Sequence, residues 1–188
     1  MNLNRRLILA SNSPRRKELL ASLGYDFDVK VKEVPEDFPD DLKRAEVAEF
    51  LASHKADAYK EDLTDEILIT ADTIVCLDEE ILNKPADIIE GRKMLRSLSG
   101  RHHEVITGVC LLSADKKFVF HDETKVYFKE LLEEEIEYYL ETFKPYDKAG
   151  GYGIQEWIGM IGIEKIEGSY FNVMGLPVQK VYHMLQKM

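Results

Sequence analysis

Residues able to hold an anion gather in the stretch ASNSPRRKELL near the start of the chain. Ser11 and Ser13 precede a proline, and Arg15 and Arg16 follow it. Ser13 followed by proline is typical of a helix start, so both arginines are expected in the first helical turn. That end of a helix already carries partial positive charge, and its free N–H groups bind anions. The stretch predicts a phosphate site; the alternative is a capped helix with solvated arginines.

A lysine interrupts an apolar stripe in the segment 42–60. The apolar positions recur at spacings of three and four, which predicts a helix with one buried face. Lys55 falls inside that face. It either extends its ammonium group to the surface or points into a site that holds negative charge. The stripe consists of Ala48, Leu51, Ala52, Ala56 and Tyr59.

An aspartate stands within the strand-forming run EILITADTIVCL, residues 66–77. Burying a carboxylate is costly unless it is paired, hydrogen-bonded or bound to a metal. Asp72 is therefore a candidate metal ligand or general base at a strand end. The alternative is a turn aspartate between two short strands. Lys84 follows in the sequence NKP and supplies one more cation.

The segment KAGGYGIQ, residues 148–155, combines three glycines with an amide side chain. Glycines allow the backbone to approach a ligand closely, or they form a plain turn. Gln155 offers a donor and an acceptor side by side, which suits the edge of a nucleobase.

These residues need elements to position them, and the sequence alternates strand and helix patterns. An antiparallel pair of long strands in the middle favours an α/β or α+β fold with a mixed sheet. The expected strands are 6–10, 25–34, 66–77, 104–112, 117–128 and 160–166, and the expected helices are 14–23, 42–60, 87–98, 131–143 and 176–187.

Composition limits the classes of function. The 188 residues carry a formal net charge of −10, which disfavours nucleic acid or an anionic membrane as the main partner. Cys76 and Cys110 lie in apolar runs and are expected to be buried free thiols of a reducing compartment. The apolar run after Arg6 is too short for a signal peptide, so the cytoplasm is the expected location.

These four segments together supply cationic side chains at separate points, acidic side chains between them and one amide. This combination predicts a site for a phosphorylated small molecule with a bound metal. The chain has no GxSxG, HExxH or GxxxxGK[ST] motif, which disfavours other common chemistries.

Eight blocks in order resemble the Maf proteins, nucleoside triphosphate pyrophosphatases also described as septum-formation inhibitors. The blocks are LILASNSPRRKELL, KEVPED, LASHKA, ADTIVCLD, NKP, LSGRHHEVITGV, DKAGGYGIQ and GSYFNVMGLP. They extend over nearly the whole chain.

The resemblance implies a fold and a reaction. It implies one domain over residues 1–188, an elongated mixed sheet with flanking helices, and a deep cleft between two lobes, similar to the inosine-triphosphate pyrophosphatases. It implies that water cuts dTTP or UTP between the α- and β-phosphates, with help from Mg²⁺ or Mn²⁺. It also implies a homodimer.

The same resemblance assigns roles to residues. Asp72 is the expected proton acceptor and a metal ligand, and Glu33 is the second expected metal ligand. Arg15, Thr73 and Gln155 match the positions that separate substrate groups within the family, here the dTTP/UTP group. The residues expected to contact phosphates are Ser11, Ser13, Arg15, Arg16, Lys55 and Lys84.

Three other functions stay open from the sequence. One is removal of modified nucleotides such as 5-methyl-UTP. The second is a nucleotide-binding regulator of cell division, in which binding rather than hydrolysis carries the signal. The third is a structural α/β interaction module, which the combination of Arg15, Lys55 and Lys84 with Asp72 disfavours.

Overall fold

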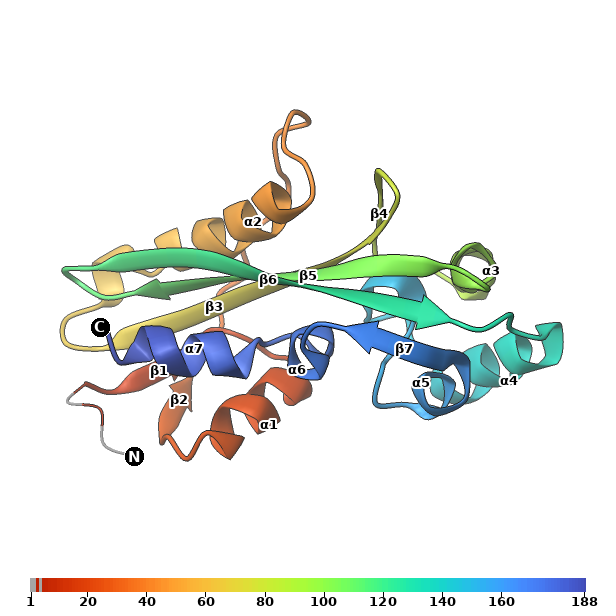
Figure 1. Cartoon of the computed structure of the whole chain (residues 1–188). Coiled ribbons are helices and arrows are strands. Elements are labelled where there is room, and N and C mark those ends of the chain that lie inside the picture. The colour runs from red at the N-terminus through yellow and green to blue at the C-terminus, as the bar shows by residue number, and fades with distance from the viewer. Residues whose placement is uncertain (1–2, 4) are drawn as a thin grey trace. The chain divides into compact units, whose positions relative to one another are not determined.

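The protein is described from a computed structural model in which residues 3 and 5–188 are placed (Figure 1). Strands and helices alternate along the chain. The strands are β1 (Leu7–Leu9), β2 (Phe27–Val29), β3 (Ile67–Leu77), β4 (Glu80–Leu82), β5 (His102–Leu112), β6 (Lys117–Phe128) and β7 (Ile163–Glu167). The helices are α1 (Pro14–Ser22), α2 (Ala45–Asp57), η1 (Lys60–Asp62), α3 (Ile88–Leu98), α4 (Glu133–Phe143), η2 (Ala149–Gly151), α5 (Trp157–Gly162), α6 (Tyr170–Met174) and α7 (Val178–Leu185).

The strands form a mixed sheet. They hydrogen-bond in the order β2-β1-β3-β5-β6-β7, and β4 pairs with β3 off this path. β1 is parallel to both β2 and β3, with Leu7 opposite Phe27 and Ile67. β4 is antiparallel to β3, and β7 is antiparallel to β6. The predicted mixed sheet with flanking helices is confirmed, and the alternation of strands and helices makes the class α/β.

The chain divides into two compact units. The first unit contains the residues up to Thr73, Thr107–Asp122 and Gly175–Met188. The second contains Ile74–Ile106 and Glu123–Met174. The strands β3, β5 and β6 contribute residues to both units. The reading of residues 1–188 as one domain stays a prediction.

In the first unit, α2 lies against one face of the strands (Figure 1). The apolar stripe predicted on this helix is buried at every position, which confirms the expected inward face. Burial of such a stripe is the main source of stability for a helix of this length. The core on this face consists of Ile8, Ala52, Ala56, Tyr59, Leu63, Leu68, Cys110 and Leu112.

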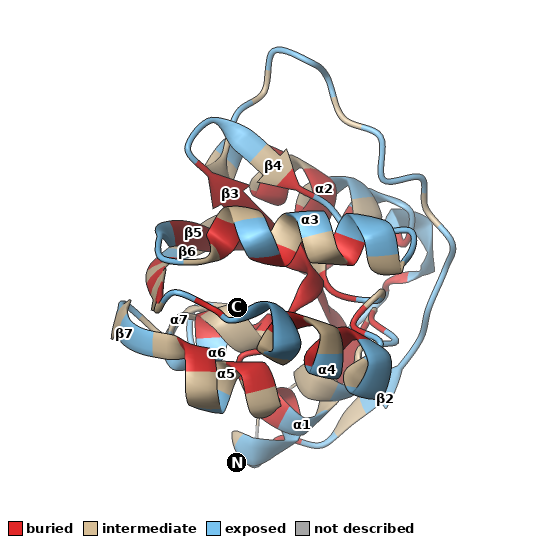
Figure 2. Ribbon diagram, turned by 90° about the vertical axis from the view of Figure 1, so that its right-hand side faces the viewer, coloured by how far each residue is buried: buried red, intermediate tan, exposed pale blue. Residues whose placement is uncertain are grey.

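The second unit has its own core. Figure 2 shows buried residues on the strands and on the helix faces turned toward them. α3, α4 and α5 each contribute to this core through Leu95, Tyr139 and Ile158. The other residues of the cluster include Val75, Leu77, Leu82, Leu98, Val105, Val126, Phe128, Ile136, Leu140, Tyr152 and Ile154.

Two predicted strands differ from the observed elements, and short elements such as β4 and α6 were not predicted. The alternating run 25–34 predicted a longer strand, but only Phe27–Val29 pairs with β1. Val29 and Val31 are exposed, so the alternation there does not report a buried face. The segment 160–166 was expected to be a strand throughout, yet its first residues complete α5. Strands and helices as short as β4 and α6 leave too few residues for a period to be recognised.

Both cysteines are buried and free, as expected. Burial raises the pKa of the Cys110 thiol to about 12, which makes it an unreactive core residue. Across residues 3 and 5–188, none of the helices is long and apolar enough to cross a lipid bilayer.

Candidate active site

The position of Asp72 follows from how α2 rests on β3. Successive strand residues point to opposite faces, so Leu68, Thr70 and Asp72 share one face. The Thr70 hydroxyl donates a hydrogen bond to the Ala52 carbonyl of α2 at 2.6 Å. One helical turn along α2, Lys55 therefore reaches the residue two places further along β3.

Lys55 is held between two carboxylates. Its Nζ lies 2.5 Å from Asp72 Oδ1 and 2.7 Å from Glu36 Oε1. The Lys55 and Asp72 side chains are 18% and 13% exposed, so the pair is largely withdrawn from water. Of the two readings left open for Lys55, the one in which it points into a site of negative charge is observed.

Asp72 does not stand at a strand end. β3 runs without interruption from Ile67 to Leu77, and Asp72 lies in its middle with 9% of its surface exposed. Both the strand end and the turn considered from sequence are therefore wrong. The carboxylate is tolerated inside the strand because Lys55 compensates its charge.

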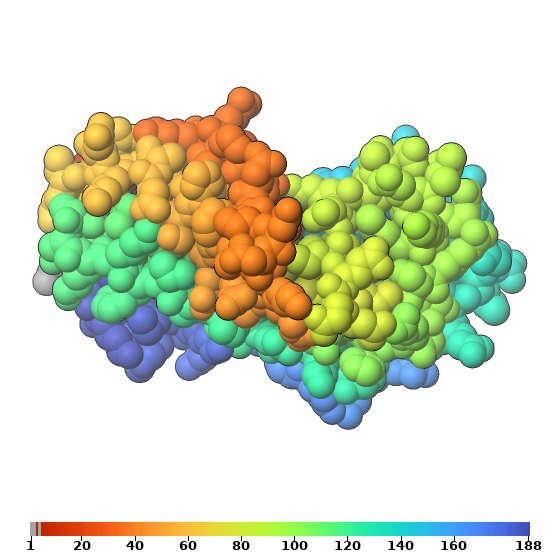
Figure 3. Space-filling view, turned by 90° about the horizontal axis from the view of Figure 1, so that it is seen from above, coloured from red at the N-terminus to blue at the C-terminus, as the bar shows by residue number. Residues whose placement is uncertain are grey.

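The acidic partner in this cluster is Glu36, which the sequence analysis did not single out. Both Glu33 and Glu36 lie in the exposed segment that precedes α2, drawn in orange in Figure 3. Among the described residues, Glu33 forms no ion pair and no side-chain hydrogen bond. Glu36, in contrast, forms an ion pair with Lys55. Glu36 lies three residues after Glu33 in the same acidic block, KEVPED.

The opening stretch folds as the cap of α1. The Ser13 hydroxyl accepts the Arg16 N–H at 3.4 Å, which confirms Ser13 as the N-cap. The Ser11 hydroxyl is buried and accepts the Ser13 N–H at 3.2 Å. Arg15 lies half-buried in the first turn of the same helix. The two serines and the two arginines thus lie at the start of one helix, as predicted, and their contact with a phosphate stays a prediction.

Arg16 makes two hydrogen bonds inside the first unit. Its Nε donates to the Gly175 carbonyl at 2.8 Å, and one Nη donates to Thr73 Oγ1 at 3.0 Å. The Thr73 hydroxyl also lies 2.9 Å from that of Thr107. Burial lowers the pKa of Arg16, while the charge of Asp72 partly opposes this effect. Neither Gly175 nor Thr107 was predicted as a partner.

Four of the predicted residues of the first unit therefore form two pairs around β3. Lys55 meets Asp72 on the face covered by α2, and Arg16 meets Thr73, whose side chain points to the other face. Asp72 still acts electrostatically on Arg16. One carboxylate on this strand is thus surrounded by cationic groups from α1 and α2.

Lys84 and Gln155 belong to the second unit. Lys84 is exposed just after β4. In the glycine segment before Gln155, Gly150 and Gly151 have positive φ values of 71° and 70°, which side chains rarely adopt. These glycines are required by the backbone turn, so the turn alone accounts for them.

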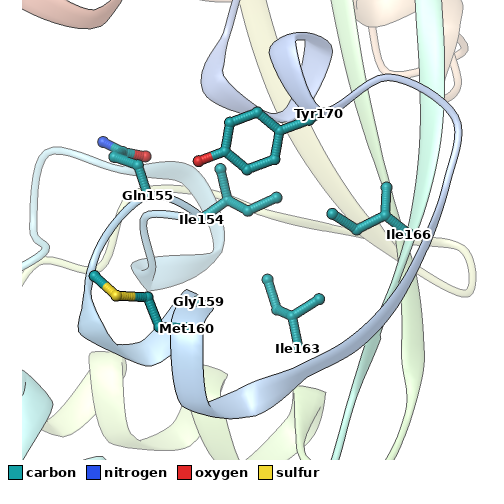
Figure 4. A pocket seen from close by; sticks show the side chains of 7 residues that line it. All are labelled: Ile154, Gln155, Gly159, Met160, Ile163, Ile166 and Tyr170. Carbon is teal, nitrogen blue, oxygen red and sulfur yellow. The ribbon is translucent and has the colours of Figure 1, made fainter.

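Gln155 lines a pocket of about 440 Å³ in the second unit (Figure 4). This size is within the range of small-molecule sites. The Oε1 atom of Gln155 is buried and has no hydrogen-bond partner among the described residues. A buried acceptor of this kind is satisfied by a donor on a ligand or a water molecule. The other lining residues are Ile154, Gly159, Met160, Ile163, Ile166 and Tyr170.

The carboxylates around Lys55 fit a divalent cation that is shared with a phosphate ligand. Asp72 and Glu36 offer oxygen atoms, which Mg²⁺ and Mn²⁺ prefer. Within residues 3 and 5–188, no three His, Cys, Asp or Glu side chains are grouped so as to hold a metal ion. Mg²⁺ is commonly bound by one or two carboxylates together with phosphates and water, so two carboxylates are compatible with such an ion.

The fold is similar to that of a solved protein of low sequence identity. The Staphylococcus aureus Ham1 protein superposes with a TM-score of 0.50, covering 66% of this chain and 72% of that one at 16% identity. This likeness concerns the arrangement of strands and helices alone.

Sequence comparison relates almost the entire chain to one protein family. A protein of Parabacteroides distasonis named dTTP/UTP pyrophosphatase is 52% identical over 183 residues, covering 96% of this chain and 95% of that protein. One of Phocaeicola vulgatus with the same name is 53% identical over 185 residues, covering 97% and 96%. The family model described as Maf-like protein matches residues 6–188. The chain, with its Asp72 strand and capped arginine helix inside that match, belongs to the Maf-like protein family.

Proposed function

We propose that this protein hydrolyses nucleoside triphosphates, with dTTP and UTP as substrates, to the monophosphate and pyrophosphate. The relatives at about half identity carry the name dTTP/UTP pyrophosphatase and match almost the full chain. The observation that carries the proposal is the contact between the Lys55 ammonium group and the Asp72 carboxylate, 2.5 Å apart and largely withdrawn from water.

Asp72 is the proton acceptor in this proposal. As a water oxygen bonds to the α-phosphorus, the water proton passes to the Asp72 carboxylate. The bond from the α-phosphorus to the bridging oxygen breaks, and pyrophosphate leaves with that oxygen and its electron pair. Lys55 fixes the carboxylate for this step, since it also contacts Glu36 and cannot swing freely.

Cationic and hydroxyl groups stabilise the charge on the phosphates. Arg15 and the helix N-terminus near Ser11 and Ser13 contact phosphate oxygens, and Lys84 adds a further contact. Arg16 has three N–H donors left beyond its bonds to Gly175 and Thr73, so it can bind an oxygen while it holds the strand. Neutralising this charge is the main task of a protein in phosphoryl chemistry.

A divalent cation fits this reaction. Asp72 and Glu36 would hold it, with Glu33 as the ligand predicted from the family resemblance. When bound, it supplies positive charge against the phosphate oxygens. Homodimer formation and the cytoplasmic location stay predictions.

Gln155 is proposed to recognise the base. Uracil and thymine present an N3–H donor beside the O4 acceptor, which an amide can pair in two hydrogen bonds. The buried Oε1 without a partner is available for the N3–H group. This role accounts for a polar side chain in the wall of a largely apolar pocket.

The proposed activity is tested on Asp72→Asn with a nucleotide panel and Mg²⁺ or Mn²⁺. Loss of the proton acceptor is expected to lower kcat for dTTP at least about a hundredfold, with little change in KM. Asp78→Asn is the matched control, because Asp78 lies in the exposed turn after β3 at a positive φ of 55° that asparagine tolerates. Near-normal turnover of Asp72→Asn, or orthophosphate as the first product, would overturn the proposal.

A further inference from the structure

The loop that carries Gln155 is closed by hydrogen bonds around one turn. The Glu156 N–H donates to the Gly153 carbonyl at 3.0 Å, and the Gly159 and Met160 N–H groups both donate to the Glu156 carbonyl. Gln155 lies inside this turn, and Figure 4 shows its amide at the rim of the pocket near Tyr170. The position of the amide therefore depends on what holds residues 153 and 156.

A single buried hydroxyl holds both residues. Tyr139 of α4 has no exposed surface. Its hydroxyl accepts the Gly153 N–H at 3.0 Å and donates to Glu156 Oε2. Burial, together with the Glu156 carboxylate, raises the pKa of the Tyr139 phenol, so it remains a proton donor at ordinary pH. One oxygen atom thus links the two ends of the turn that carries Gln155.

The Glu156 carboxylate is held from its other side as well. Lys148 Nζ lies 3.0 Å from Glu156 Oε1 and 2.7 Å from Asp147 Oδ1. The Lys148 side chain is only 10% exposed, so this ion pair is shielded from screening by salt. Lys148, Glu156 and Tyr139 form a chain of contacts that ends at the Gly153 N–H.

The aromatic ring of Tyr139, without its hydroxyl, is sufficient to fill its place in the apolar core. It packs beside Phe143 at a centroid distance of 5.2 Å and within the apolar cluster of the second unit. A phenylalanine would fill the same space without a buried polar atom to satisfy. The hydroxyl is therefore accounted for by its two bonds to the turn rather than by packing.

We propose that Tyr139 is a positioning residue for base recognition, because its hydroxyl fixes the turn from which Gln155 reads the base. This inference rests on the proposed function, in which the Gln155 amide pairs with uracil or thymine. Tyr139 does not touch the substrate, and its contribution concerns the base alone and not the cleavage of the triphosphate.

The experiment compares dTTP with its abasic analogue, 1,2-dideoxyribose 5-triphosphate, on Tyr139→Phe. Loss of the hydroxyl is expected to raise KM for dTTP roughly three- to tenfold, the usual range for one hydrogen bond. The kcat for dTTP and the kcat/KM for the abasic analogue should stay unchanged. An equal loss on both substrates, or no change in KM for dTTP, overturns the inference.

Tyr138→Phe is the matched control, since Tyr138 is the exposed neighbour on the same helix and its ring packs edge-to-face against Trp157. It should leave both substrates unaffected. If Tyr139→Phe does not fold, Glu156→Gln removes the charge that Tyr139 and Lys148 contact while keeping the shape. The same selective rise in KM is then expected, and its absence counts against the inference.

Gln155→Ala separates this inference from the proposed function. If Gln155→Ala raises KM for dTTP, adding Tyr139→Phe should produce no further rise, because the amide to be positioned is gone. A further rise in the double variant overturns the positioning role alone. If Gln155→Ala leaves KM for dTTP unchanged, base recognition by Gln155 fails, and the role of Tyr139 fails with it.

Discussion

Arg15 and Arg16 are adjacent arginines for which the sequence predicts the same role, contact with phosphate. In the structure, Arg16 also has a structural role. Two of the five N–H donors of the Arg16 side chain form hydrogen bonds, one to the Gly175 carbonyl and one to the Thr73 hydroxyl. These bonds join the start of α1, the middle of β3 and the segment after α6. Arg16 is consequently a structural tie within the first unit, in addition to its proposed contact with phosphate.

Exchange of this arginine for lysine tests the tie. Arg16→Lys keeps the charge but cannot reproduce a planar fork that serves two acceptors, so we expect a loss of about 1–3 kcal/mol in the free energy of unfolding. Lys17→Arg, the reverse exchange at the next position, is the control. At Lys17 the backbone N–H donates to the Ser13 carbonyl, and this hydrogen bond does not depend on the side chain. Lys17→Arg should change stability by less than about 0.5 kcal/mol. Urea unfolding measures the stability of both variants. If Arg16→Lys lost as little stability as Lys17→Arg, the structural role of Arg16 would be wrong, and only its proposed contact with phosphate would remain.

The sequence indicates that Asp72 and Lys55 are unusual residues, but it does not indicate that their side chains meet. A carboxylate in a strand and a lysine in an apolar stripe are each anomalous by type, so the sequence indicates both. That Lys55 meets Asp72 depends on the register between α2 and β3, which the Thr70 hydroxyl fixes. Glu36 was missed because one acid in an acidic loop has no periodicity to mark it.

At the scale of elements, the contact between α2 and β5 decides where Lys55 lies. A methyl group added to Gly108 of β5 would stand 2.2 Å from the Ala48 carbonyl oxygen of α2. That distance is a clash with backbone, which cannot move aside as a flexible side chain can. The helix backbone therefore rests directly on this glycine.

Gly108→Ala is expected to push α2 away from the sheet. We expect a loss of about 3 kcal/mol or more in the free energy of unfolding, the upper range for overpacking. Gly91→Ala in α3 is the control, because its added methyl would meet a flexible Leu140 side chain and alanine favours the helix. Thermal unfolding of both variants gives the comparison. Equal stability of the two would show that α2 does not rest on Gly108.

Elements of ordinary length were predictable, and very short ones were not. The stripe of α2 and the hairpin strands around residues 113–116 extend over enough residues to display a period. The alternating run predicts a strand longer than β2, but only three of its residues pair with a neighbouring strand. The sequence predicts strand over the last residues of α5 because its apolar residues adjoin those of β7 without a break.

At the scale of the whole molecule, a net charge of −10 coexists with a cationic site. Lys55 and Arg16 lie on opposite faces of β3 in the first unit, and Arg15 precedes Arg16 in the first turn of α1. An anionic substrate thus meets local positive charge on a chain that repels polyanions in general.

The buried histidine of the second unit links global stability to pH. His103 has no exposed surface, stacks on Phe128, and lies 2.7 Å from the Tyr152 hydroxyl through its Nε2. Burial lowers the pKa of His103 to about 3, against 6.5 for an unhindered histidine. The unfolded chain therefore takes up a proton between pH 6.5 and 3 that the folded chain does not.

The sign of the pH effect follows from that proton. His103 costs no stability above pH 6.5, and stability falls as the pH drops below 6.5, by about 1.4 kcal/mol for each unit. Between pH 7.5 and pH 5.0 we expect a loss of about 2 kcal/mol in the free energy of unfolding, measured in urea. Most carboxylates titrate below this pH range, so His103 dominates the pH dependence within it.

His103→Gln should flatten the pH dependence of stability, even where the substitution lowers stability overall. His102→Gln, at the exposed neighbour, should keep the pH dependence. A wild-type protein equally stable at both pH values, or a flattened response in His102→Gln, would show that His103 is not the group that carries the effect.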